Sequence, residues 1–387
     1  MTAGGGADLA AQADRAAAAG DLQRAWTLLT EATAGDGPAD VQLLMKLAAV
    51  SRAVGQPRAA LDAVHQALAQ APLDFVALVL RATLLDALGD AEAGQAWDNA
   101  LARRPEGDLP GPLAAAVAQG EARREAWLTE REARMKLAMA AAEARADAEQ
   151  LGRIERFRTN VLRRTRHYHS QPTEFHYPGL VEREFHPRRL FPWIERFEAA
   201  TAQITEELHT VMSAERTELV PYIQYADHAP LEQWRPLNRS KDWSAIHLLQ
   251  NGARIDANAG HCPHTMALLA GIDQPAIGGA GPNAMFSLLA PNTAIPPHVG
   301  VNNSRLVCHL PLIVPDGCWF RVGAETRFWQ SGKVIVFDDT IEHEAMNPSD
   351  QLRVVFIFDV WHPDLGDVER EAVAALVASE ESPGPAL

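Results

Sequence analysis

The stretch IPPHVGVNNSRLVCHLPL spans Ile295–Leu312, and its second half alternates polar and apolar residues as a buried β-strand does. Its polar residues include His298, Arg305 and His309. Residues two apart on a strand share a face, so Arg305, Val307 and His309 lie on the same side. We interpret the stretch as a strand that lines a metal site, because packing alone does not explain these side chains.

Short apolar runs surround this stretch and are separated by Gly, Pro or Asp. They read MFSLLAP, RLVCHLPLIV, CWFRV, KVIVFDD and RVVFIFDVW. Such runs are typical of antiparallel strands in a sandwich or barrel. We expect this all-β domain over residues 168–366, with an amphipathic helix near its start in PWIERFEAATAQITEELHTVM. Residues 367–387 are expected to form a short helix and a disordered tail.

A different pattern precedes the strands. Gly20, Gly55 and Gly89 are separated by 35 and 34 residues, close to the period of tetratricopeptide helix pairs. The sequence therefore predicts a tetratricopeptide-like α-helical repeat over residues 1–110, and an ordinary Ala-rich bundle is the alternative. Residues 111–167, rich in Ala, Glu and Arg, are expected to form a charged connecting helix.

Composition restricts the classes of function. A formal charge of −15 speaks against a surface that binds nucleic acid. Three cysteines make no disulfide framework, so we expect free buried thiols and a reducing compartment. Neither a secretory signal nor an apolar run long enough to span a membrane is readable. We therefore expect a soluble, cytoplasmic protein without a membrane span.

Two histidines and an arginine come in a suggestive order. Arg353 lies ten residues beyond His343, and His298 lies tens of residues before it. Jelly-roll oxygenases that bind iron and 2-oxoglutarate use this order, because imidazoles hold Fe(II) and a guanidinium pairs bidentately with a carboxylate. The spacing alone also fits unrelated surface histidines.

The residues from about Pro178 to Pro363 resemble the aspartyl/asparaginyl β-hydroxylase family. The motifs that carry the resemblance are PGL, FPWIERF, CPHT, FSLLAPNTAIPPHVG, RLVCHLPL, ETRFWQSGKVIVFDDTIEHEAMN and RVVFIFDVWHP. The resemblance implies a double-stranded β-helix, the cupin-like jelly roll. It also implies a dioxygenase that uses Fe(II), 2-oxoglutarate and O₂ to hydroxylate the β-carbon of Asp or Asn residues in a peptide or protein. Tetratricopeptide-like helices ahead of the domain also look like some members.

The resemblance assigns roles to individual residues. It implies that His298 and His343 ligate the metal and, with Arg353, form the catalytic set. It further implies that Ser287 and Arg353 hold the distal carboxylate of 2-oxoglutarate, while His309 touches the metal-proximal end. Members of the family lack the carboxylate of the common facial triad, and Gly300 stands at that position here.

The substrate is less well indicated. The family's peptide-aspartate hydroxylases carry arginine at the positions of Arg305 and Val307, so only Arg305 is retained for substrate binding. A peptide recruited by the helical repeats is expected. A small amino-acid-derived or lipid substrate, or a tetratricopeptide adaptor with a degenerate oxygenase domain, is the alternative. A cupin-like metal protein in which Arg353 is only an ion-pair partner is also compatible with the sequence.

Purely structural roles are also compatible with several of these residues. His309 could be a core histidine, and Ser287 could satisfy a strand edge. Asp338 and Asp339 are adjacent and so point to opposite faces of a strand. At least one of them is expected to form the turn before His343.

Overall fold

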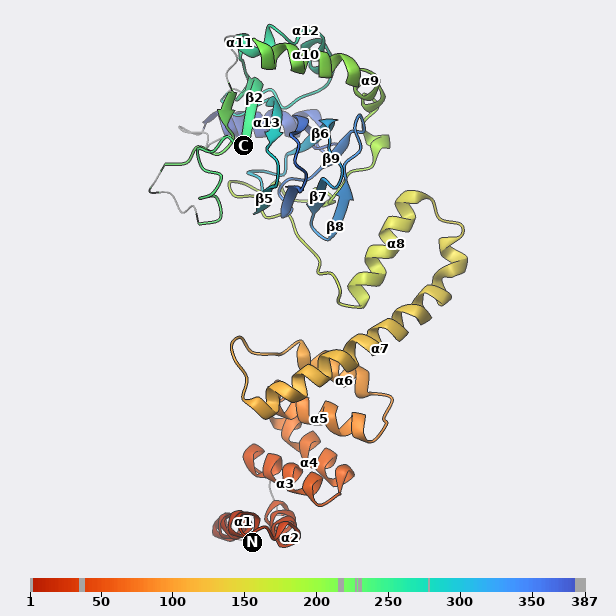
Figure 1. Cartoon of the computed structure of the whole chain (residues 1–387), viewed down its shortest axis with the longest axis vertical. Helices are drawn as coiled ribbons and strands as arrows, with labels where there is room; N and C mark the ends of the chain where they lie inside the picture. The colour runs from red at the N-terminus through yellow and green to blue at the C-terminus, as the bar shows by residue number, and fades with distance from the viewer. Residues whose placement is uncertain are drawn as a thin grey trace. The chain divides into compact units, whose positions relative to one another are not determined.

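The computed structural model describes residues 3–34, 39–214, 219–226, 228, 232–277 and 279–379. The chain divides into two compact units, residues 1–145 and 146–387. Figure 1 labels the helices and some of the strands. No helix among these residues combines the length and the apolar character needed to cross a bilayer. Cys262, Cys308 and Cys318 are buried and free, as expected.

The first unit consists of helices. They are α1 (Ala3–Ala18), α2 (Leu22–Thr33), α3 (Val41–Ala53), α4 (Pro57–Gln70), α5 (Phe75–Ala87), α6 (Ala93–Leu101) and α7 (Gly111–Glu143). Helices α1 and α2, α3 and α4, and α5 and α6 pack as pairs. The chain turns within each pair at Gly20, Gly55 or Gly89, with φ of 82°, 75° and 65°. Glycine adopts this left-handed conformation readily, so the predicted repeat is present as three helix pairs in this part of the chain.

Small residues set how closely the helices approach. Ala25, Ala60 and Ala100 are fully buried in the first unit. A Cβ atom at Gly120 of α7 would lie 2.3 Å from the ring of Trp97 on α6, so only glycine fits there. The repeats are therefore built on small side chains in place of large consensus residues.

The single connecting helix expected over residues 111–167 is wrong. Helix α7 ends at Glu143, and a separate helix, α8 (Ala148–Val161), belongs to the second unit. Asp147 accepts a hydrogen bond from the backbone N–H of Gln150, whose side chain in turn accepts from Asp147 N–H. This capping box begins a new helix and so interrupts the Ala- and Glu-rich run.

The second unit contains two antiparallel sheets. The larger has the order β1-β2-β4-β11-β6-β9, with β3 paired to β2, and the smaller has the order β5-β10-β7-β8. The larger sheet is formed by β1 (Leu219–Pro221), β2 (Trp243–Gln250), β3 (Ala253–Arg254), β4 (Ala284–Leu289), β6 (Arg305–Ile313), β9 (Ile335–Phe337) and β11 (Arg353–Trp361). The smaller is formed by β5 (Thr293–His298), β7 (Trp319–Val322), β8 (Glu325–Phe328) and β10 (His343–Asn347).

Helices cover one face of the larger sheet. They include η1 (Arg188–Leu190), α9 (Ile194–Ala199), α10 (Thr201–Ser213), α11 (Asp256–Ala259) and α12 (Pro263–Leu269). Phe197 and Leu208 from these helices share a core with Phe286 and Phe356 of the sheet. The amphipathic helix expected before the strands is thus present as α9 and α10. Helix α13 (Asp367–Ser379) follows the sheets, and the tail predicted after it, residues 380–387, lies outside the described residues.

The opposite face of the larger sheet packs toward the smaller sheet. Val307, Val355 and Ile357 of the larger sheet share a second core with Phe320 and Val322 of the smaller. Because side chains alternate along a strand, Ser287, His309 and Arg353 lie on this same face. The alternation therefore directs the predicted polar residues between the two sheets.

The stretch Ile295–Leu312 is two strands and not one. Strand β5 ends at His298 and belongs to the smaller sheet, whereas β6 begins at Arg305 and belongs to the larger. Pro296 and Pro297 cannot donate to a ladder, and β5 lies at a sheet edge, where missing donors are tolerated. The connection between them carries the chain from one sheet to the other.

Candidate active site

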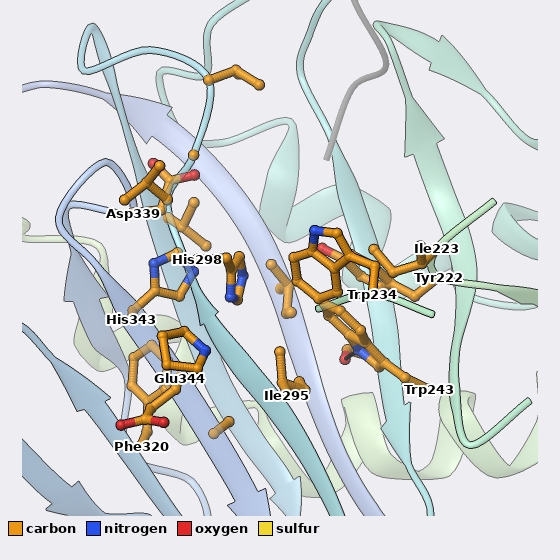
Figure 2. A pocket seen from close by; sticks show the side chains of 18 of the residues that line it. Tyr222, Ile223, Trp234, Trp243, Ile295, His298, Phe320, Asp339, His343 and Glu344 are labelled. Carbon is orange, nitrogen blue, oxygen red and sulfur yellow. Dashed lines mark hydrogen bonds between the residues drawn. The ribbon is translucent and has the colours of Figure 1, made fainter. Parts of the chain in front are cut away.

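A cavity of about 610 Å³ lies in the second unit, between the sheets. Figure 2 shows part of its wall. Five predicted site residues line it: Ser287, His298, His309, His343 and Arg353. They come from both sheets and are distant in sequence, so the fold brings the predicted set together. Arg305 does not belong to this wall.

His298 and His343 lie opposite each other on two neighbouring strands. They are register partners in the antiparallel pair β5 and β10, with ring centroids 4.0 Å apart. Figure 2 shows the two rings close together beside Asp339. The Nδ1 atom of His298 donates to the carbonyl of Pro296 at 2.8 Å, and Nδ1 of His343 donates to that of Ile341 at 3.1 Å. A carbonyl only accepts, so Nδ1 carries the proton and Nε2 keeps a free lone pair.

Both imidazoles are neutral near pH 7. Burial lowers the pKa of His298 to about 3, with a further contribution from His343, and burial lowers the pKa of His343 to about 4. A neutral imidazole whose other nitrogen is held by a carbonyl is the form that binds a metal. The pair therefore offers two nitrogen donors.

Gly300 cannot hold a side chain in this conformation. A Cβ atom built there would lie 2.1 Å from Oδ2 of Asp339. The Gly300 N–H also donates to the Asp339 carbonyl at 2.7 Å, which holds the two segments together. The described residues contain no cluster of three or more His, Cys, Asp and Glu arranged to hold a metal ion.

The adjacent aspartates have different roles. Asp338 accepts a hydrogen bond from the backbone N–H of Thr340 at 2.9 Å and also accepts from its hydroxyl. It is therefore the turn former that the sequence led us to expect. Asp339 is buried, lines the cavity, and its Oδ1 atom has no hydrogen-bond partner among the described residues.

Arg353 lies at another part of the wall, on β11. Its Nη1 atom is 3.5 Å from Oγ of Ser287 on the neighbouring strand β4, and the same hydroxyl accepts from the indole of Trp243 at 3.1 Å. The guanidinium lies over the ring of Trp329, 4.6 Å from its centroid. These contacts orient the guanidinium without neutralising it.

Arg353 has no ion-pair partner among the described residues, although only 2% of its surface is exposed. Burial lowers the pKa of this guanidinium to about 10. A buried cation normally has an anionic partner, because an unpaired one loses its hydration without compensation. The position therefore suits a ligand that carries a carboxylate.

His309 lies between these two parts of the site. Its ring contacts those of Phe337 and Trp329, with centroids 4.7 and 5.4 Å apart, and its Nδ1 has no hydrogen-bond partner among the described residues. Burial holds its pKa well below the ordinary value, and the charge of Arg353 lowers it further. A neutral imidazole with a free nitrogen on the cavity wall is placed to contact a ligand there.

Arg305 is held away from the cavity by an ion pair. Its Nη2 atom donates to Oδ2 of Asp339 at 3.1 Å, and both side chains are buried. Val307 lines the cavity two residues further along β6. The structure thus places Arg305 against Asp339, and the aspartate, not the arginine, is the member of the pair on the wall.

Sequence reasoning missed an aromatic part of the wall. Tyr222 stacks on Trp243 at a centroid distance of 3.8 Å, and Trp234 lies edge-on to His298 at 5.0 Å. Trp243, Ala245 and His247 alternate along β2, which was a signal for this strand. Tyr222 and Trp234 lie in irregular segments, where no periodicity indicates which way a side chain points.

The residues present fit Fe(II) and a dicarboxylate. Two neutral histidines supply nitrogen donors suited to iron. The lone guanidinium of Arg353, with the hydroxyl of Ser287 beside it, supplies the partner for a carboxylate. The two imidazoles, the guanidinium and the hydroxyl all line the same cavity.

The C-terminal unit matches known proteins. Residues 198–363 match the family model described as aspartyl/asparaginyl beta-hydroxylase. The mouse aspartyl/asparaginyl beta-hydroxylase is 33% identical over 186 residues, which are 48% of this chain and 25% of that protein. Aspartate beta-hydroxylase domain-containing protein 2 of Xenopus tropicalis is 30% identical over 212 residues, 54% of this chain and 55% of that protein. The chain thus spans between a quarter and about half of these relatives.

Solved structures resemble about a third of the chain. PcrH from Pseudomonas aeruginosa shares 19% identity over 33% of this chain and 93% of its own, with a TM-score of 0.27. The first tetratricopeptide repeat domain of Spaghetti, bound to an HSP90 peptide, shares 16% identity over 33% of this chain and 96% of its own, with a TM-score of 0.28.

Proposed function

Because residues 198–363 belong to the aspartyl/asparaginyl beta-hydroxylase family, we propose that this chain is an Fe(II)- and 2-oxoglutarate-dependent dioxygenase. Its reaction hydroxylates the β-carbon of an Asp or Asn residue in a peptide or protein. The two sheets of the second unit correspond in this proposal to a cupin-like jelly roll. The observation that carries the proposal is a single cavity holding two neutral histidines and a buried arginine for which the described residues supply no counterion.

Each residue has a defined task in this proposal. His298 and His343 hold the metal through Nε2, since their Nδ1 atoms are bound to backbone carbonyls. Arg353 pairs with the distal carboxylate of 2-oxoglutarate, helped by Ser287, and His309 contacts the end nearer the metal. When bound, iron and 2-oxoglutarate supply the oxidation: O₂ gives one oxygen atom to succinate and one to the product, and CO₂ is released.

The cavity wall also controls the surroundings of the reaction. Phe320, Phe337 and Trp329 surround His309, and Trp243 buries the hydroxyl of Ser287. These aromatic side chains lower the local dielectric around the buried groups and so strengthen the pairing of Arg353 with a carboxylate. Positioning of the substrate in this cavity then decides which carbon is hydroxylated.

The remaining parts of the proposal concern the whole chain. The helix pairs of the first unit would recruit a peptide, since stacked helical repeats provide an extended binding surface. The protein would act in the cytoplasm, where free thiols such as those of Cys262, Cys308 and Cys318 stay reduced.

An anaerobic titration of the Fe(II)-loaded protein with 2-oxoglutarate tests the site. Chelation of iron by the keto acid produces a visible metal-to-ligand charge-transfer band, which we expect for the unmodified protein. His343→Ala should lose the band. His209→Ala, which changes an exposed histidine on α10, is the matched control and should keep it.

Two outcomes would count against the proposal. Absence of the band from the unmodified protein would favour the alternative that the chain is an adaptor built on the helical repeats. A band that persists with equal intensity in His343→Ala would show that the two histidines are not the metal ligands.

A further inference from the structure

We infer that the cavity selects an asparagine over an aspartate as the residue to be hydroxylated. The inference rests on the proposed function and names the substrate class of the same site. It follows from the charges on the cavity wall, which leave no cation for a substrate carboxylate among the described residues.

The first step is the ion pair of Arg305 with Asp339. The arginine is the only other buried cation on the same sheet face as Arg353 in the described part of the chain, and it is neutralised by Asp339 at 3.1 Å. Only the aspartate lines the cavity. A substrate side chain that reaches this part of the wall therefore meets a carboxylate and not a guanidinium.

The second step is an unsatisfied oxygen. Oδ1 of Asp339 is buried and has no hydrogen-bond partner among the described residues. Figure 2 shows this carboxylate next to His298 and His343, where a reacting side chain must approach. An ionised carboxylate only accepts hydrogen bonds, so it requires a donor from its ligand. The NH₂ group of a carboxamide is such a donor, and an aspartate side chain offers none.

The third step is the rest of the wall. Its other acidic residues are Glu174, Glu342 and Glu344. Glu342 and Glu344 both pair with Arg321, which does not line the cavity, and Glu174 has no ion-pair partner among the described residues. Apart from Arg353, the described residues of the wall include no lysine or arginine, so acidic side chains outnumber basic ones there.

The fourth step assigns Arg353. In the proposed function its charge is used by the distal carboxylate of 2-oxoglutarate. Among the described residues that line the cavity it is the one cationic side chain, so a second carboxylate from the substrate would find no guanidinium or ammonium group to pair with. Like charges brought together in a desolvated site are strongly disfavoured, whereas a neutral carboxamide carries no such cost.

Two peptide pools provide the test. Each peptide has one central residue, Asn in one pool and Asp in the other, flanked by identical randomised positions. The full-length protein with Fe(II), 2-oxoglutarate and O₂ is incubated with each pool, and the gain of one oxygen atom is followed by mass spectrometry. We expect the Asn pool to react at least about tenfold faster, because opposing like charges in a desolvated site cost well over a factor of ten.

Variants test the cause of the preference. Asp339→Asn removes the wall's carboxylate at constant volume and frees Arg305, so the ratio of Asn to Asp turnover should fall at least about tenfold. Glu174→Gln, at the rim, should lower the same ratio by a smaller factor and does not depend on a buried residue for folding. Glu206→Gln on the exposed surface of α10 is the matched control and should leave the ratio unchanged.

The outcomes are separable from those of the proposed function. Equal or faster reaction of the Asp pool overturns the inference. Failure of both pools, in a protein that shows the charge-transfer band, also overturns it, because the cavity then takes neither side chain. Absence of that band would instead remove the oxygenase proposal on which the inference rests.

Discussion

Two buried arginines on the same face of one sheet differ in their surroundings. Arg305, on β6, pairs with Asp339 at 3.1 Å, whereas Arg353, on β11, has no anionic partner among the described residues. Burial lowers the pKa of Arg305, but the charges of Asp339 and Asp359 more than offset it and raise the pKa overall. Burial lowers the pKa of Arg353 to about 10.

The difference separates a charge that the fold itself neutralises from one that has no counterion among the described residues. An ion pair whose members are both protein groups is complete when the chain folds. A lone buried guanidinium keeps a cost in free energy that only a ligand can offset. Removing Arg305 should therefore mainly lower the free energy of unfolding. Removing Arg353 should mainly lower the affinity for 2-oxoglutarate.

The largest effect is expected for Arg305→Met. The substitution leaves Asp339 as an unpaired buried carboxylate, so the free energy of unfolding should fall by about 3–5 kcal/mol. Chemical denaturation measures this loss. The double variant with Asp339→Asn is the control and should recover part of the stability, because the uncompensated charge is gone.

The same variant has a pH dependence with a defined sign. Burial raises the pKa of Asp339, and loss of Arg305 should raise it further. The cost exists only while the carboxylate is ionised, so the stability deficit of Arg305→Met should shrink as the pH is lowered and Asp339 becomes protonated. A deficit that does not change with pH would mean that lost packing, not charge, is the cause.

The next effect is on binding and concerns Arg353→Met. Affinity for 2-oxoglutarate should fall at least about thirtyfold, since one partner of a buried charge pair is removed. The free energy of unfolding without ligand should change by less than about 1 kcal/mol, because no carboxylate loses its partner. Calorimetric titration of the Fe(II)-loaded protein and denaturation of the same sample give both numbers. A large loss of stability would mean that Arg353 is a structural residue like Arg305.

A smaller effect is stabilisation by the ligand. At a 2-oxoglutarate concentration about one hundred times its dissociation constant, the unfolding free energy should rise by about 2.7 kcal/mol. Thermal unfolding of the metal-loaded protein, with and without 2-oxoglutarate, measures the rise. Arg305→Met should keep the increase, whereas Arg353→Met should lose about two thirds of it or more at the same ligand concentration.

The smallest effect is expected for Ser287→Ala. Its hydroxyl lies 3.5 Å from Nη1 of Arg353, which is a long hydrogen bond. Affinity for 2-oxoglutarate should therefore fall by no more than about tenfold. A loss as large as that of Arg353→Met would show that the hydroxyl, and not the guanidinium, is the main contact for the carboxylate.

Much of the fold could be predicted from local patterns. The period of 34–35 residues and the glycines Gly20, Gly55 and Gly89 predicted the helix pairs, because only glycine readily turns there with positive φ. The apolar runs predicted β4, β6, β7, β9 and β11. Strand β2 was missed, since WSAIHLLQ contains polar residues and its partner β4 lies about 40 residues away. The alternation of Trp243, Ala245 and His247 was a local signal for the strand, but its pairing with β4 cannot be read from a local pattern.

The break between β5 and β6 shows a second limit. Gly300, Asn302 and Asn303 are a local signal for a turn, but nothing in the sequence indicates that residues 299–304 carry the chain to another sheet. Similarly, Ala148–Val161 has the composition of α7, and only the capping box at Asp147 separates the two helices. Composition describes propensity, whereas the boundary depends on a few specific hydrogen bonds.

The sequence by itself determined the set of candidate residues: the motifs and their spacing identify His298, His343, Arg353, Ser287 and His309, and all five line one cavity. Only the tertiary structure decided which of the two arginines lines the cavity. The reason is that the charge available in a pocket depends on pairs such as Arg305 with Asp339, whose members are 34 residues apart in the chain. Sequence spacing does not encode such a pair, because the sheets bring its members together only when the domain folds.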